Sequence, residues 1–535
     1  MADLIFVNAV VLTQDPDRPR ADSLAVSGGR IVAVGSWEEI SAVASPGARR
    51  IDLGGRTVVP GFNDAHVHVW KMGHLLTSML DLRGVRSIPA LQRAVREAGD
   101  PSNAGGWVVG RGYNEAELAE SRSPTRWDLD EAAPDRPVYL TRTCGHIAVA
   151  NSKAMALAGI GPDTQAPQGG VIVRDSRGEA TGVFHETAMS LVSRCLPEPT
   201  AADYEAMILA AARHQLALGI TSATDAGVPP SILSVYRAME ARSALPYRLN
   251  VMALRRPVGG PETLPLPERS RSDFLRVDTI KILADGGLSG ATAALRAPYR
   301  HCEDCGVLRL DAAELYDLTA DAHRAGLRVA THAIGDAAID TVLDAYERLA
   351  ELGACPWEPG GAGPRHRIEH FGLPHPPQLA RAARLGVVVV PQAVFIRSLG
   401  VNFRRYLPDD LLNRAYPLRE MLDAGLVMAL SSDAPVVADD DPLLGIQAAV
   451  LRRDDEGELI AADQAISAAE ALSAYTLGGA LASGDAHDRG SVSVGKWADL
   501  TVLSDNPLDV APEALTDIQV DMTWVGGALA FERSI

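Results

Sequence analysis

The sequence predicts an α/β protein that is built around a (β/α)₈ TIM barrel. Three observations support this fold class. Eight short strand candidates recur along the chain, amphipathic helical stretches separate several of them, and ionisable residues stand at the ends of five strands. At 535 residues the chain is too long for one small core, so we expect two or three structural units.

The two ends of the chain are predicted to form β-structure. Residues 23–34 have the pattern of a hairpin with a Gly-Gly turn, and residues 522–531 repeat it near the C-terminus. A further strand candidate at 498–503 precedes the second hairpin. Because neither end can bury a sheet face alone, we expect residues 1–57 and 486–535 to form one small β-sandwich domain.

Between these ends, strands and helices alternate, as is typical of a parallel α/β sheet. Helical stretches occur, for example, at 312–324 and 377–384. The barrel is therefore expected to use residues 58–74 and 201–485. The eight strand candidates are 57–69, 220–225, 248–253, 279–284, 327–332, 366–370, 387–391 and 427–432.

One connection is much longer than a barrel needs. About 150 residues separate the first strand from the second, and they contain strand candidates at 107–110, 137–141 and 171–174. We interpret residues 75–200 as an inserted α+β lid domain. The insertion follows the C-terminal end of the first strand, so we expect it over the face where barrel enzymes carry out chemistry.

Composition argues against several classes of function. The net charge of −18 disfavours nucleic acid and anionic membrane as partners. No apolar run approaches the length of a membrane span, and the first residues show no signal-peptide pattern. Five cysteines, an odd number, fit a reducing compartment better than a disulfide scaffold. We therefore expect a cytoplasmic protein whose partner is a small molecule.

The most informative motif is the pair His66 and His68 near the end of the first strand. Alternate residues of a strand project to the same side, so both imidazoles can bind one ion. The motif alone is weak, but later strand ends supply further candidate ligands. Imidazole and carboxylate suit Zn²⁺, and also Mn²⁺, Fe²⁺ or Ni²⁺, so we predict a divalent metal site with zinc as the first candidate. The additional ligands are Lys281, His332, His370 and Asp433.

Lys281 needs a separate explanation, because a protonated lysine with a pKa of about 10.4 cannot bind a metal. Carboxylation by CO₂ would convert it into an anion that can bridge two cations. Water held between two metals becomes a hydroxide nucleophile near neutral pH. Asp433 could then bind one metal and carry the proton to the leaving amine. An ordinary buried ion pair is the alternative role for Lys281.

Plainer interpretations of the other candidates also stay open. His332 and His370 could be core histidines, and Asp433 could cap a helix that begins near residue 434. Asp336 could cap a helix or orient His332. His146, in the insertion, either contacts the substrate or lies in an ordinary loop. Candidates for a pocket wall or an anion contact are Trp70, Trp107, Tyr113, Arg111, Arg296 and Arg300.

Together these motifs resemble the amidohydrolase superfamily, and more narrowly its YtcJ-like, N-substituted formamide deformylase-like branch. The segments that carry the resemblance are 60–68, 281–287, 331–336, 367–370 and 432–435, with 105–113, 145–151 and 182–184 in the insertion. Two local departures are visible. Ser431 stands where the branch often has glycine, and the run 286–290 replaces a more usual Gly-Ser-Leu-Gly-Ser. The second departure is close to the expected pocket and points to altered specificity.

The resemblance implies a metal-dependent hydrolase of non-peptide carbon–nitrogen bonds, with a barrel and a β-sandwich. It assigns His66, His68 and Asp433 to one metal. It assigns His332 and His370 to a second metal, with Lys281 as the bridge. Members of the branch hold one metal or two, and a homodimer is compatible with the family.

We therefore predict an enzyme that cleaves an amide, an N-substituted formamide or a cyclic amide. Metal-activated hydroxide attacks the carbonyl carbon, Asp433 moves the proton, and His146 assists as an electrophile. Three alternatives stay open. The same metal site could hydrolyse an ester or lactone, it could catalyse a lyase or decarboxylase reaction, or the chain could be a non-catalytic binding protein.

Overall fold

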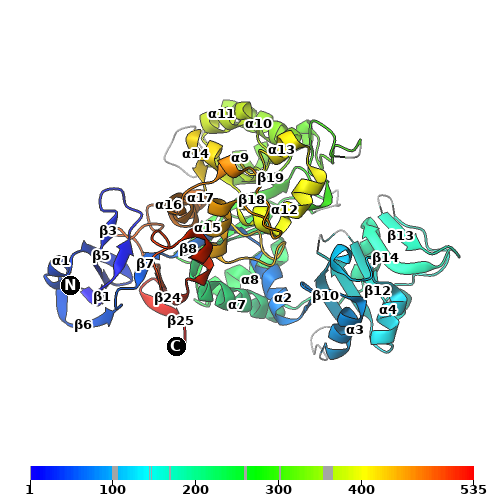
Figure 1. The fold of residues 1–535 in the computed structure, drawn as a ribbon, viewed down its shortest axis with the longest axis horizontal. Helices are drawn as coiled ribbons and strands as arrows, with labels where there is room; N and C mark the ends of the chain where they lie inside the picture. Colours follow the sequence, from blue (N-terminus) through cyan, green and yellow to red (C-terminus); the bar gives the residue numbers. More distant parts are fainter. Residues whose placement is uncertain are drawn as a thin grey trace. The chain divides into compact units, whose positions relative to one another are not determined.

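The computed structural model describes residues 2–534 except 99–105, 144, 146, 168–169, 258–261, 301–302 and 353–364. The chain folds into two compact units (Figure 1). We call Met1–Val69 together with Ala212–Ile535 the main unit, and Trp70–Ala211 the inserted unit. The inserted unit contains the whole of the segment 75–200 that the sequence marks as an insertion.

The main unit contains the predicted parallel sheet, with a strand at each of the eight predicted positions, although the first differs in its extent. The strands follow one another in chain order, each parallel to the next. Backbone hydrogen bonds of 2.8 Å from Asp433 N to His66 O and from His68 N to Ala434 O join the chain after the last strand to the first. The sheet is therefore curled as in a TIM barrel. The strands are β8 (Phe62–Val67), β15 (Ile220–Val228), β16 (Arg248–Leu254), β18 (Leu275–Leu283), β19 (Arg328–Ala333), β20 (Arg367–His370), β21 (Val388–Val390) and β22 (Val427–Met428), with β17 (Ser270–Arg271) antiparallel to β18.

The first predicted strand, 57–69, is wrong as a single element. It is divided into β7 (Thr57–Pro60) and β8, which belong to different sheets. Pro60 has no N–H for a ladder, and Gly61 N turns to donate to Asp499 O at 2.9 Å. A Cβ on Gly61 would collide with the side chain of Thr221, so glycine permits this close approach between β8 and β15.

Helices follow several of the barrel strands, and two of them match the predicted stretches. The helix α9 (Ala312–Arg324) begins after Asp311, whose side chain accepts a hydrogen bond from Glu314 N at 2.8 Å. Its last turn carries His323 and Arg324, as the helix dipole favours. The other helices of the main unit are α1 (Trp37–Ser41), α8 (Pro230–Ala241), α10 (Asp336–Glu351), α11 (Pro376–Leu385), α12 (Val394–Tyr406), α13 (Asp409–Leu412), α14 (Leu418–Asp423), α15 (Pro442–Leu451), α16 (Ala468–Ser473) and α17 (Gly479–Ser483).

Strands from both chain ends form two further sheets of the main unit, and both predicted hairpins are confirmed. The blue N-terminal strands and the red C-terminal strands lie together in Figure 1. Their shared core includes Phe6, whose ring meets Trp524 edge to face with centroids 5.0 Å apart. One sheet contains β1 (Ala2–Val7), β4 (Ser23–Ser27), β5 (Arg30–Gly35) and β6 (Ala44–Asp52). The other contains β7, β2 (Val10–Leu12), β3 (Arg20–Ala21), β23 (Leu500–Leu503), β24 (Val520–Val525) and β25 (Ala528–Glu532).

The inserted unit is built on its own mixed sheet, and the three strands predicted there are confirmed. Trp107 and Tyr113 are buried in its hydrophobic clusters and serve packing. The strands are β9 (Leu80–Asp81), β10 (Val108–Tyr113), β11 (Val138–Arg142), β12 (Ile147–Ala150), β13 (Gly170–Arg174) and β14 (Ala180–Glu186). The helices are α2 (Val69–Thr77) and α7 (Ala201–Ala217), which start and end in the main unit respectively, and α3 (Ile88–Glu97), α4 (Arg126–Ala132), α5 (Ser152–Leu157) and α6 (Ser190–Ser193).

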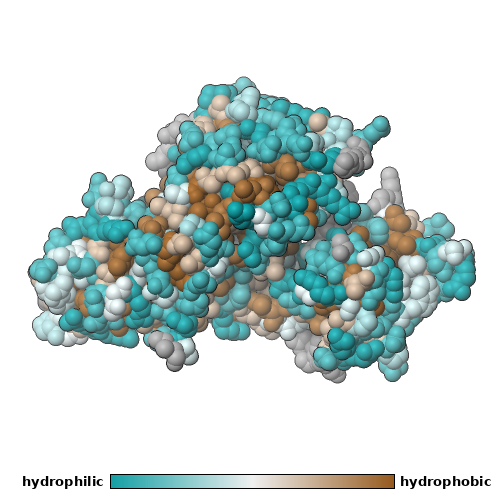
Figure 2. All heavy atoms as spheres, viewed as in Figure 1, coloured by the Kyte–Doolittle hydropathy of each residue, from teal (hydrophilic) through white to brown (hydrophobic). Residues whose placement is uncertain are grey.

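The surface of each unit is mainly hydrophilic on the face shown in Figure 2. Among the helices of the described residues, none combines the length and the apolar character that crossing a membrane requires.

A buried histidine is expected to make stability depend on pH. His366 Nδ1 accepts a hydrogen bond from Val329 N at 3.0 Å, and its Nε2 lies 3.1 Å from His323 Nδ1. Burial lowers the pKa of His366 from 6.5 to about 3. The unfolded chain therefore takes up this proton first as pH falls. The free energy of unfolding should fall by up to about 1.4 kcal/mol per pH unit below the ordinary histidine pKa.

Urea unfolding between about pH 4.5 and 7.5 tests this expectation in His366→Asn, where the amide oxygen replaces Nδ1 as acceptor. The variant should lose part of the acid-side slope. His487→Asn, which changes an exposed histidine, is the control. Equal slopes in the parent and His366→Asn would contradict the prediction.

Candidate metal centre

The structure brings together the predicted ligands of the barrel. The ring centroids of His66 and His370 lie 5.0 Å apart, and those of His332 and His370 lie 4.3 Å apart. Asp433 Oδ1 lies 3.5 Å from His66 Nε2 and 3.3 Å from His68 Nε2. These side chains come from the ends of β8, β19 and β20 and from the segment after β22, so the strand-end prediction explains why they meet.

His66, His68 and Asp433 have the geometry of a metal site. One potential ligand atom from each lies within 4.8 Å of the others. Lys281, in β18, is also buried, with 3% of its surface exposed. Burial lowers the pKa of His66 and of His370, and the positive charge of Lys281 contributes to both shifts.

The protein fixes the ring orientation of the two histidines on the first strand. His66 Nδ1 lies 2.5 Å from Glu369 Oε2, and His68 Nδ1 lies 2.8 Å from the carbonyl oxygen of Ala226. A neutral imidazole that donates through Nδ1 presents the lone pair of Nε2. The Nε2 atoms are the ones that face Asp433.

The other two histidines are held in the same manner. His370 Nδ1 lies 2.6 Å from Gln392 Oε1, which leaves Nε2 for a ligand. His332 is reversed, because its Nε2 lies 2.9 Å from Gly286 O and 3.2 Å from Asp285 Oδ1. Its Nδ1 is therefore the nitrogen left for a ligand. Partners of this kind set the tautomer and the basicity of metal-binding histidines.

The electrostatics of the site suit ligands in their metal-binding forms. Burial lowers the pKa of His66 and of His370, which keeps both rings neutral. Burial alone would raise the pKa of Asp433, but the hydrogen bond to His68 and the electrostatic interactions with the surrounding imidazoles hold it well below its ordinary value. Asp433 is therefore an ionised carboxylate.

Three residues that position the histidines were missed by the sequence analysis: Asp285, Glu369 and Gln392. Asp285 accepts hydrogen bonds from the backbone N–H groups of Ala294, Ile334 and Gly335 at 2.9–3.1 Å. Asp285 and Gln392 follow β18 and β21 by two residues. A search of strand ends for every polar residue would have found them.

Several alternatives from the sequence are wrong. Among the described residues no helix begins near residue 434, so Asp433 is not a helix cap. Asp336 does not orient His332. It begins α10, and it accepts from Arg296 N at 3.0 Å and lies 3.0 Å from His375 Nε2.

The three arginines that the sequence suggested as anion contacts bind other groups of the protein. The guanidinium of Arg296 pairs with Asp340, and that of Arg300 pairs with Asp409. Arg111 donates to the carbonyl oxygen of Thr143 at 3.3 Å. His146 lies outside the described residues.

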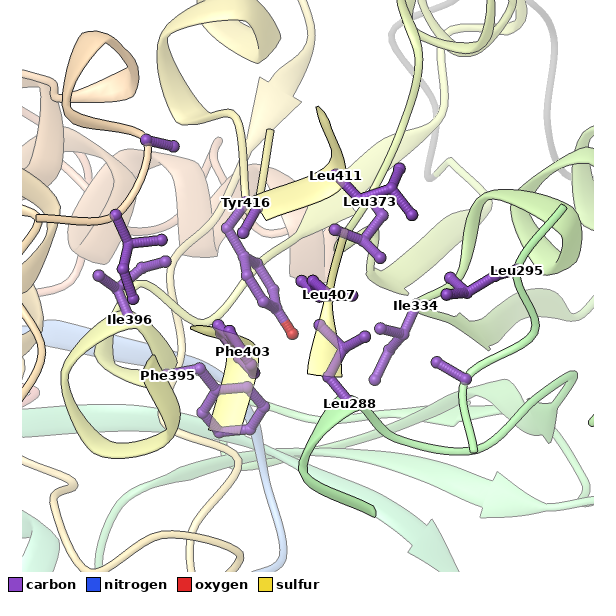
Figure 3. Close-up of a cluster of buried hydrophobic side chains, with 14 of the residues drawn as sticks. Leu288, Leu295, Ile334, Leu373, Phe395, Ile396, Phe403, Leu407, Leu411 and Tyr416 are labelled. Carbon is purple, nitrogen blue, oxygen red and sulfur yellow. The ribbon is translucent and has the colours of Figure 1, made fainter. Parts of the chain in front are cut away.

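The hydrophobic cluster shown in Figure 3 contains Phe395, which lies next to one of the histidines, His370. Phe395 stacks on the ring of His370 at 6.4 Å and meets Tyr416 edge to face at 6.1 Å. Leu288 and Ile334 also belong to this cluster. Leu288 comes from the segment 286–290, whose sequence differs from the usual pattern of the branch. One side of the site is therefore apolar, and the unusual segment contributes to it.

Comparison with known proteins assigns the chain. The model of the amidohydrolase family matches residues 49–531. The chain belongs to this family. It is 32% identical to the N-substituted formamide deformylase of Arthrobacter pascens, over 100% of this chain and 99% of that protein. It is 31% identical to the putative amidohydrolase YtcJ of Bacillus subtilis (strain 168), over 99% of each chain.

Solved structures agree with the family. The crystal structure of an uncharacterized metal-dependent hydrolase from Pyrococcus horikoshii OT3 matches with a TM-score of 0.79 and 27% identity, over 95% of this chain and 99% of that one. The resemblance to the amidohydrolases is thus confirmed. The protein is an enzyme of the amidohydrolase family, a metal-dependent hydrolase of carbon–nitrogen bonds.

Removal of a positioning group should weaken metal binding. In Gln392→Leu, His370 Nδ1 loses its acceptor and the ring can rotate or change tautomer. We expect metal affinity to fall by about 10–100-fold, as for other groups that support metal-binding histidines. Competition with a chromophoric chelator measures the change. Gln447→Leu, another buried glutamine that bonds the backbone near residue 512, is the matched control. Equal affinities in both variants would contradict a positioning role.

Proposed function

We propose that this amidohydrolase cleaves a non-peptide amide bond in an N-substituted formamide, another amide or a cyclic amide. The main support is the meeting of four imidazoles and one carboxylate, with the second nitrogen of each imidazole held by the protein. Similarity to a protein named N-substituted formamide deformylase over the whole chain supports this substrate class.

The donor set fits a divalent metal, and zinc in particular, because it consists of imidazole nitrogens and carboxylate oxygens. We assign His66, His68 and Asp433 to one ion. His332 and His370 would hold a second ion, with Lys281 as the bridge after carboxylation of its amine by CO₂. A bound metal would supply Lewis acidity, which polarises a carbonyl group and lowers the pKa of water.

The protein groups supply positioning and proton transfer. Asp433, ionised in its buried position, accepts the proton of the attacking water and delivers it to the leaving nitrogen. Glu369 fixes the ring of His66, and Gln392 fixes the ring of His370. The apolar cluster at Phe395 limits the water around the reacting bond. His146 is proposed as an electrophile that assists the carbonyl oxygen.

We also propose roles for the parts outside the barrel. The two terminal sheets share a hydrophobic core and would act as a β-sandwich domain. The inserted unit begins directly after Val69. This position in the chain, just beyond His68, suits a lid or specificity element. A cytoplasmic location, a small molecule as the partner and a homodimer stay predictions from the sequence.

Metal content per chain, measured on protein purified without chelator, tests the proposal together with Lys281→Ala. We expect nearly two equivalents in the parent and fewer in the variant, because the carboxylated lysine would bridge the ions. One equivalent in both proteins would remove the bridging role of Lys281. Absence of metal after reconstitution would overturn the proposal.

Activity is tested with a panel of N-substituted formamides, amides and cyclic amides. His68→Ala should lower kcat/KM by at least about 100-fold, because it removes a ligand rather than a supporting partner. Product masses distinguish hydrolysis, which adds one water, from a lyase reaction. Unchanged activity after His68→Ala, or after removal of metal, would contradict the mechanism.

A further inference from the structure

A second buried carboxylate, that of Asp64 in β8, is bound to the metal centre by hydrogen bonds. Asp64 is 1% exposed. His66 N donates to its Oδ1 at 3.3 Å, and Ser432 N donates to the same oxygen at 3.1 Å. The hydroxyl of Ser432 donates to Oδ2 at 2.6 Å. All three donors are neutral, so burial of this carboxylate costs free energy that apolar packing would avoid. Such a cost is typical of functional sites.

Ser432 uses its whole side chain in this contact. Its hydroxyl has one hydrogen, which goes to Asp64 Oδ2, and its oxygen accepts a hydrogen bond from Ala434 N at 3.0 Å. The residue between Ser432 and Ala434 is Asp433, whose carboxylate is a proposed metal ligand. The hydroxyl therefore fixes the chain on both sides of that ligand.

The turn at Asp433 is also attached to β8 by its backbone. Asp433 N donates to His66 O, and His68 N donates to Ala434 O, both at 2.8 Å. The φ of +56° at Asp433 is uncommon for residues other than glycine, so it needs such support. Its carboxylate then faces His66 Nε2 at 3.5 Å and His68 Nε2 at 3.3 Å.

We propose that Asp64 and Ser432 act as a pair that positions the carboxylate of Asp433. Both side chains are buried and hydrogen-bonded within the protein, so they act through Asp433. The pair fixes that carboxylate beside the two histidines of β8, which raises the affinity for the ion that these three side chains bind. It also holds the carboxylate in place for proton transfer. The inference rests on the proposed function, in which Asp433 has both roles, and each role is tested separately.

Competition of the zinc-loaded enzyme with a chromophoric chelator tests the role in metal binding. Ser432→Ala removes the hydroxyl and leaves Asp64 Oδ2 and Ala434 N without these partners. The affinity for zinc should fall about tenfold, the lower end of the range for groups that support metal ligands. Ser483→Ala is the matched control, at a buried serine whose hydroxyl donates to Gly479 O within α17.

A second background separates positioning from damage to the fold. Asp433→Gly removes the carboxylate, and glycine adopts the positive φ without strain. In this background Ser432→Ala should change zinc affinity by less than about twofold, because the group that the hydroxyl positions is gone. Damage to the fold would lower the affinity in both backgrounds. Equal losses in the two backgrounds, or a Ser432→Ala variant that binds zinc as the parent does, would overturn the proposal.

Asp64→Asn tests the other member of the pair. The amide oxygen can still accept from Ser432 N, but the NH₂ group cannot accept from the Ser432 hydroxyl. Zinc affinity should fall here too. The double variant with Ser432→Ala should lose less than the product of the two single effects, because both changes break the same contact. Asp454→Asn is the control, at a buried carboxylate that pairs with Arg404. Fully additive losses would contradict the pairing.

Steady-state kinetics at saturating zinc test the role in proton transfer. With an amide that the parent hydrolyses, Ser432→Ala should lower kcat about tenfold and change KM by less than about twofold, because a displaced Asp433 impairs proton transfer rather than substrate binding. If the parent hydrolyses no amide, the proposed function fails, and the zinc comparison still decides whether the pair positions Asp433. If the parent is active and Ser432→Ala keeps its kcat, the role in proton transfer is wrong.

Discussion

The contact between the Glu369 carboxylate and His66 Nδ1 joins the metal centre to the interior of the barrel. Glu369 and its partner Arg367 have no exposed surface, and Arg367 also donates to Ala65 O at 2.7 Å. One buried ion pair therefore connects β20 to β8 and fixes a histidine at the same time. Removal of one member of such a pair costs about 3–5 kcal/mol, because the remaining charge stays buried without compensation. The position of His66 is thus set by the packing of the whole sheet, and a displacement of either strand would disturb the ligand set.

The backbone is strained where the side chains turn toward the site. His370 and Asp433 have φ angles of +71° and +56°, and Tyr416, beside Phe395, has a φ of +50°. Such conformations cost of order 1–3 kcal/mol each and persist where the surroundings hold them. Asp433 N donates to His66 O at 2.8 Å, and Tyr416 N donates to Gly372 O at 2.7 Å. These hydrogen bonds to distant parts of the chain stabilise backbone conformations that the local sequence alone would not adopt.

The positive φ angles also explain why only part of the site could be predicted from the sequence. Strand positions and the residues at strand ends follow from periodicity and polarity, so His66, His332 and Asp433 could be expected at one edge of the sheet. Strand alternation, however, places Glu369 and His370 on opposite faces. The positive φ of His370 breaks that alternation, and both side chains reach the neighbourhood of His66. The partner of Glu369 is 303 residues away in the sequence, so only the curvature of the sheet reveals it.

The short segment from His66 to Val69 combines two tasks. Its two histidines face Asp433, and Val69 N donates to Asp225 Oδ1 at 3.1 Å, which fixes the start of α2 on the barrel. Asp225 is held in turn by a 2.5 Å hydrogen bond from the hydroxyl of Tyr236. The next residue, Trp70, is the first of the inserted unit. The anchor at Asp225 therefore fixes the two histidines at the point where the chain enters the insertion.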